Sequence, residues 1–77
     1  MMAFVLVPLE GTPRRLKADS FPAALTEFKA NPEQGVLVQF GAVTPSYFYT
    51  WSSGDITLGS VVPGRREWAG KIARAVL

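Results

Sequence analysis

The sequence predicts a single small α+β domain over residues 1–77, with a mainly antiparallel sheet of four to five strands and two helices. Apolar residues recur with a period of two in several short segments and with a helical period in two others. Short turn sequences separate neighbouring strands, and such turns join antiparallel strands. The predicted order is β-β-α-β-β-β-α.

The first two strands differ in character. Residues 3–9 are almost continuously apolar, which is typical of a central strand buried on both faces. A turn over residues 10–13 leads into residues 14–18, where polar and apolar side chains alternate. This segment is expected to be a half-exposed edge strand, with Arg15 and Lys17 discouraging pairing with another sheet.

A helix is predicted to follow. Asp19 or Ser20 can accept hydrogen bonds from the first free amides, and Pro22 suits a first turn because it has no amide to satisfy. Asn31 precedes a proline, which disfavours helical backbone there, so the helix is expected to end at this point. The apolar stripe of this helix comprises Phe21, Ala24, Leu25 and Phe28.

Three further strands and a helix complete the chain. Residues 35–40 and 47–51 alternate with a period of two, and residues 53–55 predict a hairpin turn into a strand over residues 56–62. Pro63 and Gly64 are expected to end that strand. Residues 65–77 predict an amphipathic helix, with an apolar stripe of Trp68, Ile72 and Val76.

The composition argues against catalysis. There is no Cys and no His, which excludes thiolate or imidazole metal sites, Cys nucleophiles and His-dependent triads. The six acidic residues are scattered along the chain, so no pair of carboxylates or metal-ligand cluster is evident. We expect a protein that is not an enzyme and that uses no cofactor and no metal.

The charge distribution bears on partners and location. The formal net charge is only +2, and residues 61–77 hold four basic residues against one acidic residue. This is a weak signal for nucleic acid, whose binders usually carry a denser basic stripe. No apolar run approaches the roughly 20 residues of a membrane span, and the N-terminal residues do not resemble a signal peptide. A cytoplasmic protein without membrane contact is expected.

The aromatic segment is the most informative feature for function. Strict alternation places Tyr47, Tyr49 and Trp51 on one face of a strand and Phe48 on the other. If both helices cover the Phe48 face, three large rings are exposed together, and Tyr and Trp are typical of binding hot spots. In the alternative interpretation the Tyr47 face belongs to the core.

The predicted function is a small protein-binding or regulatory module that occupies the surface of a partner protein. The rings would be its anchors, and the orienting charges would be Arg14, Arg15, Arg65 and Arg66. Arg65 and Arg66 could instead receive an anion at the start of the last helix. Two alternatives stay open: a module that binds single-stranded nucleic acid on the aromatic strand, and a structural subunit that self-associates.

Overall fold

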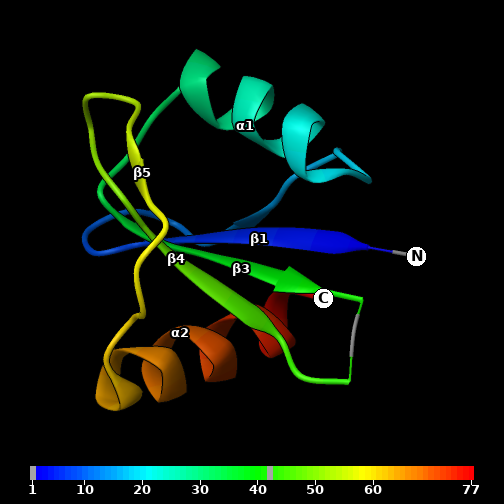
Figure 1. Ribbon diagram of the computed structural model, residues 1–77, viewed down its shortest axis with the longest axis vertical. Coiled ribbons are helices and arrows are strands. Elements are labelled where there is room, and N and C mark those ends of the chain that lie inside the picture. Colours follow the sequence, from blue (N-terminus) through cyan, green and yellow to red (C-terminus); the bar gives the residue numbers. More distant parts are fainter. Residues whose placement is uncertain (1, 42) are drawn as a thin grey trace.

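A computed structural model describes residues 2–41 and 43–77 of the chain. It confirms the α+β fold, with five antiparallel strands in the order β2-β1-β3-β4-β5 and two helices. Figure 1 shows α1 on one side of the sheet and α2 on the other. The elements are β1 (Ala3–Pro8), β2 (Arg14–Arg15), α1 (Phe21–Ala30), β3 (Gly35–Phe40), β4 (Ser46–Thr50), β5 (Ile56–Thr57) and α2 (Pro63–Val76).

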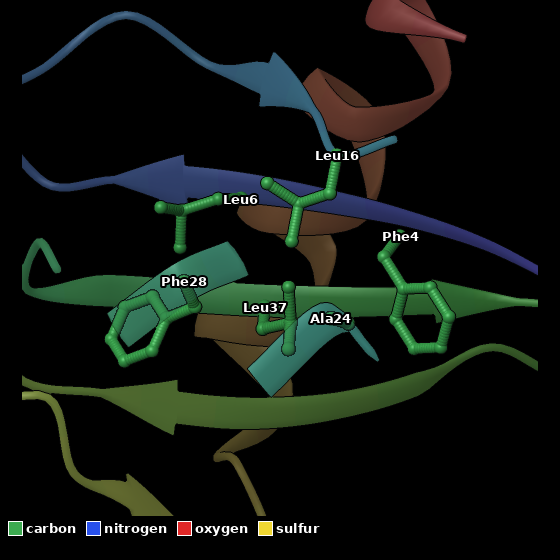
Figure 2. Packing of buried hydrophobic residues seen from close by; sticks show 6 residues of the cluster. All are labelled: Phe4, Leu6, Leu16, Ala24, Phe28 and Leu37. Carbon is green, nitrogen blue, oxygen red and sulfur yellow. The ribbon is translucent and has the colours of Figure 1, made fainter. Parts of the chain in front are cut away.

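Strand β1 lies inside the sheet, between β2 and β3, as its apolar sequence predicts. Phe4 and Leu6 face α1, whereas Val5 and Val7 face α2. All four side chains are fully buried. Figure 2 shows the cluster on the α1 side, where Phe28 and Ala24 of the helix pack over the sheet. The sheet is therefore the middle layer of three, with a core on each face.

Helix α1 begins and ends where its capping residues predict. The Ser20 hydroxyl accepts a hydrogen bond from the Ala23 amide, and proline occupies the first turn. Asn31 is the C-cap residue. Its carbonyl oxygen accepts a hydrogen bond from the Arg14 guanidinium, a cation at the end of the helix where the backbone dipole favours positive charge.

Helix α2 begins at Pro63, two residues earlier than expected. Proline lacks an amide hydrogen, so it suits the first turn of a helix as well as the end of a strand. The residues that face the sheet are small and buried: Ala69, Gly70 and Ala73. Small side chains let the helix backbone approach the valines of β1 and β3 closely.

The two outer strands are shorter than predicted. β2 comprises only Arg14–Arg15, because the Glu27 carboxylate of α1 accepts hydrogen bonds from the amides of Lys17 and Ala18 and draws the chain away from the sheet. β5 comprises only Ile56–Thr57. Beyond it the chain leaves the sheet and leads into α2.

The premise that both helices cover the Phe48 face is wrong. Phe48 packs with the α1 cluster, and Tyr47 and Tyr49 pack with the α2 cluster. Each face of the sheet thus has its own helix. Within the described ranges, 2–41 and 43–77, neither helix has the length and apolar character needed to cross a membrane.

Candidate functional site

The expected platform of three exposed rings does not form. Tyr47 and Tyr49 point to the same face, as strand alternation requires, but both are half-buried against the α2 cluster. The Tyr49 hydroxyl accepts a hydrogen bond from the Val62 amide at 3.3 Å. The Tyr47 hydroxyl lies over Gly70, 2.8 Å from where a β-carbon on that residue would be. Both tyrosines therefore hold α2 and the segment before it against the sheet.

Trp51 is the one member of the trio with a substantially exposed ring. It follows the end of β4 and is 41% exposed. Its indole N–H donates a 2.8 Å hydrogen bond to the hydroxyl of Thr57 on the neighbouring strand. This bond restricts the orientation of the ring.

The four arginines lie in separate places. Arg14 faces the α1 side, since it pairs in register with Leu6, and it forms an ion pair with Glu33. Arg15 faces the opposite side of the sheet. On α2, the Arg65 guanidinium lies 5.3 Å from the centroid of the Trp68 ring, and Arg66 is exposed.

These positions do not form one charged rim around the aromatic strand. Arg14 already has acceptors within the chain, and Arg65 stacks on an aromatic ring. Of the four arginines, Arg15 and Arg66 are exposed, whereas Arg14 and Arg65 are half-buried.

The β4–β5 hairpin produces a site that the sequence analysis missed. Gly54 has a positive φ of 96° and follows a turn in which its amide donates to the Trp51 carbonyl. The Trp51 amide in turn donates to the Asp55 carbonyl. Along an antiparallel ladder, residue pairs that are hydrogen-bonded to each other alternate with pairs that are not. Trp51 and Asp55 form a hydrogen-bonded pair, so Tyr49 and Thr57 form the next one. The amide and carbonyl of Ile56, which lies between, therefore point away from β4.

Apolar groups flank this outer strand. Leu58, directly after β5, is 77% exposed. A groove of about 290 Å³ lies between α1 and β5, and Phe21, Leu25, Ile56 and Leu58 form its apolar lining. Lys29 and Asp55 also line it. The alternation of Ile56, Thr57 and Leu58 in the sequence did predict a strand here. It did not predict that this strand is the outermost one of the sheet.

The described residues, 2–41 and 43–77, contain no group of three or more acidic side chains placed to hold a metal ion. Comparison of the chain with known protein families, with curated proteins and with solved structures finds no match.

Proposed function

We propose that the chain is a non-enzymatic protein-binding module, and that its partner contributes an extended peptide segment that pairs with β5. The observation that carries this proposal is the outward-directed backbone of Ile56 on the outer strand of the sheet. Edge strands with free amides and carbonyls are ready templates for another strand.

The side chains around β5 support the same proposal. Successive residues of an added strand would face opposite sides of the sheet. On the α1 side they would meet Leu58 and the apolar groove. On the α2 side the peptide side chains would meet Thr57 and Trp51. The hydrogen bond between these two residues holds the indole ring in place. Backbone pairing would supply affinity, and these two apolar contacts would supply selectivity.

The short edge limits the strength of the interaction. Ile56–Thr57 offers few backbone hydrogen bonds, and each contributes about 0.5–1.5 kcal/mol net. Most of the binding energy must then come from burying Leu58 and Trp51, which are exposed in the free protein. This balance is typical of a transient regulatory contact rather than a permanent assembly.

Single-stranded nucleic acid fits the geometry less well. A stacking platform needs several exposed ring faces beside basic side chains. Here Tyr47 and Tyr49 are half-buried beneath α2, and Arg14 is engaged with Glu33. The surface around β5 includes Asp55 as well as Lys29, so it is not a basic groove.

A selection from a phage-displayed library of linear peptides tests the proposal. We expect binders with alternating apolar residues, and affinity should fall about tenfold or more in Leu58→Ser and in Trp51→Ala. Leu58 is mostly exposed, so Leu58→Ser should leave the fold intact. Trp51→Ala also removes the hydrogen bond to Thr57, so circular dichroism checks that this variant is folded.

Val43→Ser is the matched control, because Val43 is also a fully exposed apolar residue but lies in the β3–β4 connection, outside the proposed surface. It should leave binding unchanged. Peptides that bind Leu58→Ser and Trp51→Ala as tightly as the unaltered chain would contradict the proposal. Self-association that Leu58→Ser abolishes would instead identify a second copy as the source of the added strand.

A further inference from the structure

A pocket on the other side of the sheet brings together several hydrogen-bond donors. It lies between the start of β4 and α2 and has a volume of about 450 Å³. Its lining includes Tyr47 from the strand and Arg66, Glu67 and Arg74 from the helix. None of these residues lines the groove between α1 and β5, although Tyr47 and Arg66 line a neighbouring pocket together with Leu58.

Helical spacing explains why two arginines share this pocket. Arg66, Gly70 and Arg74 follow one another at intervals of four residues, which places them on the same face of α2. Gly70 has no side chain, so Tyr47 and Arg74 can both lie close to the helix backbone between the two arginine positions. The Tyr47 hydroxyl lies 2.8 Å, and Nη1 of Arg74 3.2 Å, from the place of a β-carbon on Gly70. Both groups therefore converge over the same glycine.

The donors in this pocket form no hydrogen bond to the described part of the chain. There, Arg66 and Arg74 form no ion pair, and neither their side chains nor the Tyr47 hydroxyl form a hydrogen bond. Glu67 is the acidic side chain of the pocket, so the two guanidinium groups leave an excess of positive charge. The site offers donors from three positions and one net positive charge.

We propose that this pocket binds the phosphate group of a small ligand. Guanidinium groups match oxyanions through paired N–H donors, and the tyrosine hydroxyl adds a donor from a different direction. The tetrahedral oxygens of phosphate can accept from all three positions, whereas a carboxylate offers two oxygens in one plane. Arg66 belongs to the site, and Arg65 does not, because its guanidinium lies over Trp68.

Titration of the ¹⁵N-labelled protein with inorganic phosphate tests this assignment, with chloride at equal ionic strength as the reference. We expect saturable shifts of the Nε–Hε resonances of Arg66 and Arg74. Arg74→Gln should weaken phosphate binding about tenfold or more, since a hydrogen bond to a charged group is lost. Glu67→Gln should tighten binding, because it removes a negative charge from the pocket.

Lys71→Gln is the matched control. It removes one positive charge from the same helix, outside the pocket lining, and should weaken binding far less than Arg74→Gln does. If Arg74→Gln does not fold, Tyr47→Phe serves in its place, because it keeps every charge and removes only the hydroxyl. Tyr47→Phe should also weaken binding.

Three results would overturn the proposal. The first is a shift that does not saturate. The second is an equal loss of affinity in Lys71→Gln and Arg74→Gln, which would indicate general charge attraction. The third is acetate binding as tightly as phosphate, which would assign the pocket to carboxylates.

Discussion

Gly35 begins β3 and pairs with Pro8 at the end of β1. A β-carbon there would lie 2.2 Å from the Val7 carbonyl oxygen and 2.6 Å from the α-carbon of Pro8. Both are backbone atoms of a central strand, so they cannot move without disturbing the sheet. Close approach of two strands, rather than a special backbone angle, requires glycine at this position.

Gly35→Ala should therefore lower the free energy of unfolding by about 3 kcal/mol, as overpacking of a rigid site does. Urea unfolding followed by circular dichroism measures the change. Gly64→Ala is the control, because nothing lies within 4 Å of a β-carbon there and alanine favours helix. It should raise stability by up to about 1 kcal/mol. Equal effects of the two substitutions would contradict this account of Gly35.

Tyr47 and Tyr49 show why residue type alone did not predict which surfaces are free. A tyrosine is suited both to an exposed hot spot and to a half-buried position with its hydroxyl at a polar group. Here the Tyr49 hydroxyl contacts the Val62 amide and the Tyr47 hydroxyl lies over Gly70, so both rings are half-buried. These contacts come from residues distant in the sequence. The pattern predicted which face the rings share but not what covers that face.

At the scale of elements, α1 depends on a local cap. The Ser20 hydroxyl accepts from the Ala23 amide, one of the first amides of the helix that lack a carbonyl partner. Ser20→Ala should lower the free energy of unfolding by about 1 kcal/mol, and Ser20→Gly by only a few tenths. Thermal unfolding of the two variants measures the difference. Unchanged stability in Ser20→Ala would show that the hydroxyl is not acting as this cap.

The ends of the helices and strands were not equally predictable. The caps of α1 follow from neighbouring residues: Asn31 was predicted as the end, and Ser20 is one of the two residues, with Asp19, that were candidates for the start. The length of β2 depends on Glu27 of α1. Its carboxylate accepts hydrogen bonds from the amides of Lys17 and Ala18, which are nine or ten residues earlier in the chain. The open edge of β5 likewise depends on where the following segment leaves the sheet. Such boundaries are set by tertiary contacts.

At the scale of the whole molecule, the placement of the helices determines which surfaces are free. An amphipathic helix shows which of its own sides is apolar, but not which face of the sheet it covers. The continuous apolar run of β1 did hold this information, because Phe4 and Val5 face opposite sides and both are fully buried. A sheet that is buried on both faces needs one of the two helices on each face.

This arrangement moves the available contact surface from the face of the sheet to its edge. With α1 and α2 on the two faces, the lateral edge at β5 is left open. Trp51 and Leu58 lie beside that edge and remain exposed. The fold and the sheet order therefore favour strand addition over stacking on a flat aromatic face.

Amide hydrogen exchange of Ile56, measured by nuclear magnetic resonance with and without a selected peptide, tests this claim most directly. The Ile56 amide points away from β4, whereas Thr57 already pairs with Tyr49. We predict that peptide binding slows exchange at Ile56 strongly and changes exchange at Thr57 little. A bound peptide that leaves the Ile56 amide exchanging at its free rate would contradict pairing at β5.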